Sequence, residues 1–184
     1  MVNIHQILQG CKRGERHSQQ ALYQHYAPTL LALCMRYTKH KEEAEDLLQE
    51  GFLIIFTKID QFKNDGSFEG WMRKIMVNCA LQKYRSQKNK LHIAPVEILD
   101  YDKAQLDTIL PTIAQKELLK LIQQLPPSYK LIFNLYVFEG YKHREIALLL
   151  GISEGTCKSN LFDARVILQK GVLNNLKTKQ IINA

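Results

Sequence analysis

One segment of the chain combines positive charge with aromatic and amide side chains, which is the chemistry that single-stranded nucleic acid requires. Between residues 71 and 90 there are six Lys and Arg residues and no Asp or Glu. Cations along a helix attract a phosphate backbone, while aromatic and amide groups capture unstacked bases. The segment therefore predicts a surface that holds one strand. The side chains that carry this prediction are Phe68, Trp71, Arg73, Lys74, Asn78, Lys83 and Arg85.

The aromatic members of this set have a second interpretation. Large aromatic side chains at helical spacing are more often part of a core than of a binding surface. For Trp71 and Phe68, base contact and packing in the core therefore remain alternative roles.

A second segment, from residue 143 to residue 165, has the pattern of a helix-turn-helix. Gly151 suits a left-handed end of the first helix, Ile152 fills the angle between the helices, and Ser153 can cap the second helix. A plain helical hairpin with a solvated face is the alternative. The coincidence of Glu-Ile-Ala, Gly-Ile-Ser and Thr-x-Lys-Ser favours duplex DNA binding in a major groove. The inward positions of the second helix are Cys157, Leu161, Ala164 and Leu168, and the candidate DNA contacts are Arg144, Ser153, Thr156, Lys158, Ser159, Asn160, Phe162 and Arg165.

A third segment reverses the charge. Residues 42 to 50 include five acidic residues and no Lys or Arg, whereas the whole chain has a net charge of +7 and a pI near 9.2. Separate acidic and basic faces indicate two different partners. On charge alone, the acids only solvate a helix face, and a metal or paired-carboxylate site would need a concave, partly buried setting that one exposed helix does not supply.

The elements that must position these residues are helical. Apolar residues recur at three- and four-residue steps and no run alternates with period two, so the fold class is all-α. Ser67 is the expected N-cap of the basic helix, after a turn at residues 63 to 66. The expected helices cover residues 21–37, 44–59, 67–87, 112–125, 128–138, 142–150 and 153–172.

The helical periodicity of the apolar residues is absent between the third and fourth of these helices. We therefore expect two small helical domains, at residues 1–90 and 112–184, joined by a flexible linker at residues 91–111 that holds Pro95, Pro111 and several acids. The 46% of hydrophobic residues is enough for two small cores.

Several function classes are not supported by the sequence. It has no glycine-rich phosphate loop, no GxSxG and no HExxH, so neither an enzyme nor a cofactor is expected. Its four cysteines are far apart and are interpreted as core residues, not as zinc ligands or disulfides. No segment has the length of apolar residues that a membrane helix needs and no signal peptide is evident, so the expectation is no membrane insertion and a cytoplasmic location.

Three segments of the first domain resemble region two of the extracytoplasmic-function (ECF) sigma factors, which are subunits of bacterial RNA polymerase. Leu22-Tyr-Gln-His-Tyr-Ala-Pro28 is similar to the opening helix of that family, residues 42–52 to its polymerase-binding helix, and residues 67–78 to its promoter-melting helix. From Leu125-Pro-Pro onward, the second domain resembles region four. The order and spacing of the segments are more specific than any one of them.

The resemblance implies a set of partners and roles. The partners are the bacterial RNA polymerase core, promoter DNA and, as in the family, a possible anti-sigma factor. The acidic helix would dock on a coiled coil of the polymerase clamp, and the basic helix would hold the non-template strand of the minus-10 element, with a base pocket formed by Ile75, Asn78 and the loop from Asn64 to Ser67. The helix-turn-helix would read the minus-35 element. The polymerase-binding role would fall to Asp46, Leu47, Gln49, Glu50 and Phe52, with Leu47 and Phe52 as apolar anchors.

Two positions depart from the family pattern. Asp163 and Asn160 stand where recognition helices of this family commonly carry Arg. A carboxylate cannot contact phosphate or guanine, although it can accept from a cytosine amine or face away from DNA. We therefore expect altered minus-35 specificity or a weaker reliance on that element.

Two other classes of function compete with this interpretation. An ordinary helix-turn-helix regulator would bind a palindrome as a dimer without polymerase. An adaptor that keeps the sigma fold would bind polymerase without directing transcription.

Overall fold

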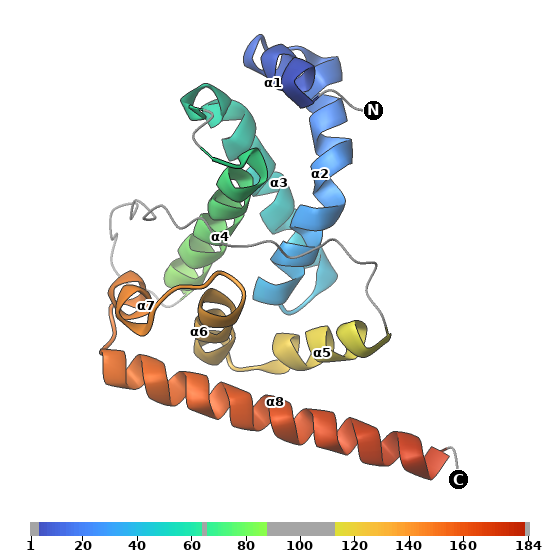
Figure 1. Cartoon of the computed structure of the whole chain (residues 1–184), viewed down its shortest axis with the longest axis vertical. Coiled ribbons are helices and arrows are strands. Elements are labelled where there is room, and N and C mark those ends of the chain that lie inside the picture. The colour runs from blue at the N-terminus through green and yellow to red at the C-terminus, as the bar shows by residue number, and fades with distance from the viewer. Residues whose placement is uncertain (1–3, 64–65, 88–112, 183–184) are drawn as a thin grey trace. The chain divides into compact units, whose positions relative to one another are not determined.

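The computed structural model describes residues 4–63, 66–87 and 113–182, with the side chains of residues 87, 113–114 and 177–182 left out. Among these residues every regular element is a helix, which confirms the all-α class. The chain separates into two compact units, residues 1–102 and 103–184 (Figure 1). The expected linker, residues 91–111, lies outside the described residues, as does Asn64.

The first unit is a bundle in which three long helices pack against one another. They are α2 (Arg16–Tyr37), α3 (Lys41–Lys58) and α4 (Phe68–Gln87), and a short 3-10 turn, η1 (Ile59–Gln61), follows α3. The expected helices at 21–37, 44–59 and 67–87 are confirmed. The fully buried core side chains are Leu22, Leu30, Leu47, Ile55, Ile59, Met72 and Met76.

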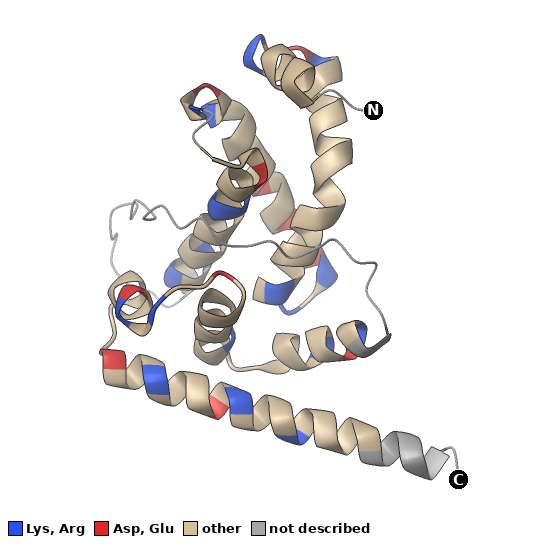
Figure 2. Cartoon of the chain, viewed as in Figure 1, with Lys and Arg blue, Asp and Glu red and all other residues tan. Residues whose placement is uncertain are grey.

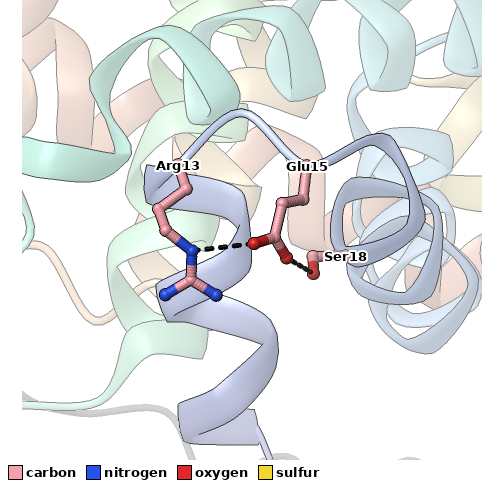
Figure 3. A network of polar contacts seen from close by, with 3 residues as sticks. All are labelled: Arg13, Glu15 and Ser18. Carbon is pink, nitrogen blue, oxygen red and sulfur yellow. Dashed lines mark hydrogen bonds and ion pairs between the residues drawn. The ribbon is translucent and has the colours of Figure 1, made fainter.

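An additional helix, α1 (Ile4–Lys12), precedes the bundle and packs on α2 and η1. The turn from α1 to α2 passes through Gly14, whose φ of 75° lies in the left-handed region. Figure 3 shows how Glu15 closes this turn: its carboxylate accepts hydrogen bonds from Arg13 Nε at 2.7 Å and from Ser18 Oγ at 3.1 Å. The bonds from Arg13 and then Ser18 lower the pKa of Glu15. The contact joins the turn after α1 to the first turn of α2.

The second unit is built along one long helix. Helices α5 (Ile113–Gln124), α6 (Pro127–Val137) and α7 (His143–Leu150) all contact α8 (Glu154–Ile182). The four helices expected here are confirmed, and α8 extends ten residues beyond the expected end at Val172, to Ile182. The centre of this core holds Ile122, Ile132, Leu135, Ile146, Cys157, Leu161, Ala164 and Leu168.

The four cysteines are all free and buried, which confirms that they are core residues. Desolvation by burial raises the pKa of Cys34 to about 12 and that of Cys79 to about 11. Both thiols therefore remain protonated at neutral pH and behave as small apolar groups. No cluster of three or more His, Cys, Asp or Glu side chains suited to a metal ion occurs within the described ranges. None of the helices in those ranges is both long and apolar enough to span a bilayer.

Helices α3 and α4 approach closely because Gly51 has no side chain. A Cβ at Gly51 would collide with Sδ of Met76, a residue with no exposed surface. Gly70, near the start of α4, has more room: a Cβ there would lie 3.7 Å from Cβ of Ser67, an ordinary contact. The two helical glycines are a matched pair that differ in the space around them.

We expect Gly51→Ala to lower the free energy of unfolding by about 1–3 kcal/mol, because the added methyl group overpacks a filled core. Gly70→Ala should raise it by up to about 1 kcal/mol, since alanine favours a helix. Urea unfolding followed by the fluorescence of Trp71, the single tryptophan and a member of this unit, measures both. Equal effects of the two substitutions would contradict the packing explanation.

Candidate nucleic-acid and protein interfaces

One face of α3 presents acidic and amide groups around an exposed leucine. Asp46, Gln49 and Glu50 are exposed, and Leu53 is 69% exposed. Spacings of three, four and seven residues place these four side chains on one side of the helix. We call Asp46, Gln49, Glu50 and Leu53 the α3 stripe. Its carboxylates can pair with Arg or Lys of a partner, and its leucine can fill an apolar pocket there.

The structure corrects two of the residues expected to bind the partner. Leu47 is 1% exposed and Phe52 is 3% exposed, because both belong to the opposite face of α3, which packs into the bundle. They hold α3 in place and cannot act as surface anchors in this conformation. The sequence analysis missed Leu53, although its position three residues after Glu50 is the signal that places it on the acidic face.

Some of the acids at the start of α3 already have partners. Glu43 Oε2 accepts a hydrogen bond from the backbone N–H of Lys39 at 3.2 Å, and Glu45 pairs with Lys41 at 3.2 Å. These contacts stabilise the first turn of the helix. The carboxylates of the stripe lie farther along, at Asp46 and Glu50.

The basic helix begins as its sequence indicated. Ser67 Oγ accepts a hydrogen bond from the backbone N–H of Gly70 at 3.3 Å, which is the N-cap geometry. The aromatic residues near this end pack together: the rings of Phe68 and Trp71 are stacked with centroids 5.5 Å apart, and Phe62 contacts both. Phe68 is buried and Trp71 is half-buried. Packing therefore explains Phe68, while Trp71 keeps part of its ring at the surface.

The cations of α4 do not share one environment. Arg73 is only 8% exposed and Ile75 is also buried, so neither offers much surface to a strand. Lys74, Lys83, Arg85 and Asn78 are half-exposed. The expectation of a contact by Arg73 or Ile75 conflicts with this burial.

Four of the half-exposed residues of α4 fall on one line. Trp71, Lys74, Asn78 and Arg85 are separated by three, four and seven residues, so they follow one face of the helix, and no acid interrupts it. We call these four residues the α4 stripe. Figure 2 shows Lys and Arg recurring along this helix. A ring, an amide and two cations in line match what a single strand needs.

The helix-turn-helix has the turn that the sequence predicted. Gly151 has a φ of 63°, and the backbone N–H of Ile152 donates to the carbonyl of Ala147 at 3.1 Å. Ser153 Oγ accepts from the backbone N–H of Thr156 at 3.0 Å, which caps α8. The turn thereby fixes the angle at which α8 leaves α7.

The predicted inward stripe of α8 is buried, and most of the predicted contacts are exposed. Phe162 stands out as a large apolar side chain on the open face, and Lys158 forms an ion pair with Glu154 at 2.9 Å. Asn160 is half-buried. The exposed members of the predicted DNA-contact set are Arg144, Ser153, Thr156, Lys158, Ser159, Phe162 and Arg165.

Asp163 has a partner that the sequence analysis missed. The hydroxyl of Tyr129, on α6, donates to Asp163 Oδ2 at 3.3 Å. The nearby carboxylate is the main cause that raises the pKa of Tyr129. One oxygen of Asp163 is thus held toward α6, and no local pattern links residues 34 positions apart.

Both units match known families. Residues 22–90 match the family described as Sigma-70 region 2, and residues 115–168 match Sigma-70, region 4. The RNA polymerase sigma-H factor of Pseudomonas aeruginosa is 26% identical over 91% of this chain and 92% of its own length. The ECF RNA polymerase sigma factor SigW of Bacillus subtilis is 28% identical over 86% and 91%.

Similar lengths are covered in other comparisons. The ECF RNA polymerase sigma-E factor of Escherichia coli is 23% identical over 90% of this chain and 92% of its own. Among solved structures, the sigma factor RpoE in complex with the anti-sigma factor NepR, from Bartonella quintana, has 21% identity and a TM-score of 0.49, covering 83% of this chain and 95% of that chain.

Proposed function

The chain belongs to the ECF-type RNA polymerase sigma factors, with sigma-70 regions 2 and 4 in its two units, and from this premise we propose which surfaces carry its activity. As a sigma factor it is a non-catalytic subunit that directs RNA polymerase to promoters. We assign polymerase binding to the α3 stripe, capture of the opened minus-10 strand to the α4 stripe, and minus-35 recognition to the exposed face of α8.

The observation that carries this assignment is the separation of charge within the first unit. The α3 stripe holds two carboxylates around Leu53, and the α4 stripe holds two cations with a ring and an amide. An acidic and apolar face suits a basic protein surface, whereas an acid-free cationic face suits a phosphate backbone. Two partners can therefore bind one rigid bundle at the same time.

The α4 stripe can offset the energetic cost of opening DNA. Extracting a base from the duplex costs a few kcal/mol, and stacking on an aromatic ring returns about 1–3 kcal/mol per base. The half-exposed ring of Trp71 and the amide of Asn78 supply stacking and hydrogen bonding, while Lys74 and Arg85 hold the backbone. Lys83 lies on a different side of the helix and adds long-range attraction only.

Two further proposals follow from the family. We place the protein in the cytoplasm, because its polymerase and promoter partners are there. We also propose control by an anti-sigma factor that covers the α3 or α4 stripe, since covering either one would stop initiation.

In vitro transcription tests the proposed function. Purified bacterial core polymerase and the chain are combined on fragments of the source genome, and transcript starts are mapped. We expect transcripts that begin at a fixed distance from a shared pair of upstream elements and that disappear without the chain. Polymerase binding without any transcript would indicate an adaptor instead, and a palindromic footprint without polymerase would indicate a regulator.

Leu53 and Leu47 provide a matched test of the α3 stripe. Leu53→Ala should weaken core polymerase binding about tenfold, the loss typical of a central apolar contact, with little change in stability. Leu47→Ala should lower the free energy of unfolding by about 2–5 kcal/mol, since it leaves a cavity. Competition for core polymerase and urea unfolding measure the two effects. If Leu53→Ala bound core polymerase as tightly as the wild-type chain, the stripe would not be the interface.

Asp163 tests the assignment of α8. Asp163→Arg should strengthen minus-35-dependent binding and steepen its salt dependence by about one phosphate contact. The reason is that a carboxylate, which the DNA phosphates repel, is replaced by a cation. Asp163→Asn, which removes the charge and keeps the shape, should fall between the two. Holoenzyme titrations at several salt concentrations measure this, with a promoter lacking the minus-35 element as the control. Unchanged promoter affinity on Asp163→Arg would count against the assignment.

A further inference from the structure

The only contact recorded for Arg165 in the described part of the chain is aromatic. Its guanidinium carbon lies 5.6 Å from the centre of the Tyr136 ring, which belongs to α6. Within those residues Arg165 forms no ion pair, whereas Lys158 on the same helix is paired with Glu154 at 2.9 Å. The two cations of this part of α8 are therefore held in different ways.

An aromatic ring and a carboxylate do not leave an arginine in the same state. A carboxylate neutralises the charge and occupies N–H donors, while the face of a ring attracts the cation and leaves its donors available. Arg165 thus keeps a full charge and its fork of donors for phosphate or guanine. Lys158 must first break its ion pair with Glu154 before it can contact DNA.

The Tyr136 ring is itself fixed in place. The imidazole of His143, at the start of α7, stacks on it with centroids 4.6 Å apart and an interplanar angle of 25°. His143 Nδ1 lies 3.5 Å from Sγ of Cys157, which is buried in α8. The series Cys157, His143, Tyr136 and Arg165 therefore links all three helices around the turn.

We propose that Tyr136 is a positioning residue for promoter binding, whose ring holds the Arg165 guanidinium in place on the DNA-binding face of α8 and leaves its N–H donors available. The proposal rests on the proposed minus-35 role of α8. A side chain that is ordered before binding loses less conformational freedom on binding. Tyr136 does not itself touch DNA in this scheme.

The test compares variants at Tyr136 in holoenzyme bound to a promoter mapped by transcription. Tyr136→Met keeps the bulk but removes the ring, and it should weaken binding about two- to fivefold, the range for an exposed cation–π contact. Tyr136→Phe keeps the ring and should bind like the wild-type chain. Val137→Ala, at the exposed neighbouring position, is the control and should change nothing.

A double-mutant cycle separates positioning from general stability. Tyr136→Met should have no further effect once Arg165→Ala is present, and none on a promoter that lacks its minus-35 element. It should also leave the salt dependence nearly unchanged, whereas Arg165→Ala should reduce the slope by about one phosphate contact. Thermal unfolding of each variant confirms that the unit is folded.

The outcomes distinguish the positioning role of Tyr136 from the proposed minus-35 role of α8. If Tyr136→Phe lost as much affinity as Tyr136→Met, or if Tyr136→Met and Arg165→Ala added independently, Tyr136 would have no positioning role. If Arg165→Ala left promoter binding unchanged, the minus-35 assignment of α8 would fail at this residue, whatever Tyr136 does.

Discussion

The contact between α3 and α4 at Gly51 and Met76 determines how the first unit can work. Because α3 carries no side chain at this point, the two helices pack closely enough for Met76 to fill the space between them. Close-packed interiors do not deform smoothly, so the angle between the helices is fixed. The α3 stripe and the α4 stripe lie on the remaining faces of these two helices. Their separation is therefore set by the core, so that the proposed polymerase contact and the proposed strand contact would be held at a constant geometry.

In the second unit, too, one side of the helix packs in the core while the other faces carry charges, but here the acidic and basic residues are mixed. The inward stripe of α8 packs into the core. Between residues 154 and 165, the other faces of α8 carry two acids and two bases, Glu154, Lys158, Asp163 and Arg165. Two tyrosines of α6 each contact one of these charged residues. The hydroxyl of Tyr129 donates a hydrogen bond to Asp163, and the ring of Tyr136 lies against the guanidinium of Arg165. The supporting helix thus influences which charges of the recognition helix are presented.

The sequence predicted those features that depend on local chemistry. Helical periodicity located seven helices, and Gly151, Ser153 and Ser67 fixed the turn and the two caps because their bonds reach only a few residues. It was less successful where similarity to a family motif identified a residue but not the side of the helix on which that residue lies. Leu47, Phe52, Arg73 and Ile75 were expected at a binding surface and are buried, and Phe68, for which base contact and packing were both left open, is buried as well. Counting the helical phase from Asp46 would have separated Leu47 and Phe52 from the α3 stripe, and counting from Trp71 would have separated Arg73 from the α4 stripe. Phase does not separate Phe68 and Ile75, which lie three residues before and four residues after Trp71; their burial depends on how α4 packs in the bundle. The Tyr129 to Asp163 bond could not be found in this way, since it depends on how α6 packs against α8.

The charge balance of α4 and α8, the two helices proposed to bind DNA, has a consequence for promoter choice. Release of counterions from DNA scales with the number of phosphates that a protein neutralises. The four residues of the α4 stripe include two cations and no Asp or Glu, whereas α8 from Glu154 to Arg165 has a net charge of zero. Of these two surfaces, the α4 stripe therefore has the stronger attraction to the backbone. In its proposed role, the segment of α8 from Glu154 to Arg165 reads base edges, where Phe162 can contact a thymine methyl group and Ser159 can bond either kind of pair. Arg165 adds a cation that forms no ion pair within the described residues. Since the two units act in one chain bound to one polymerase, a weak upstream contact still adds to the local concentration of the other, so that modest reading of duplex DNA is sufficient once the melted strand is held.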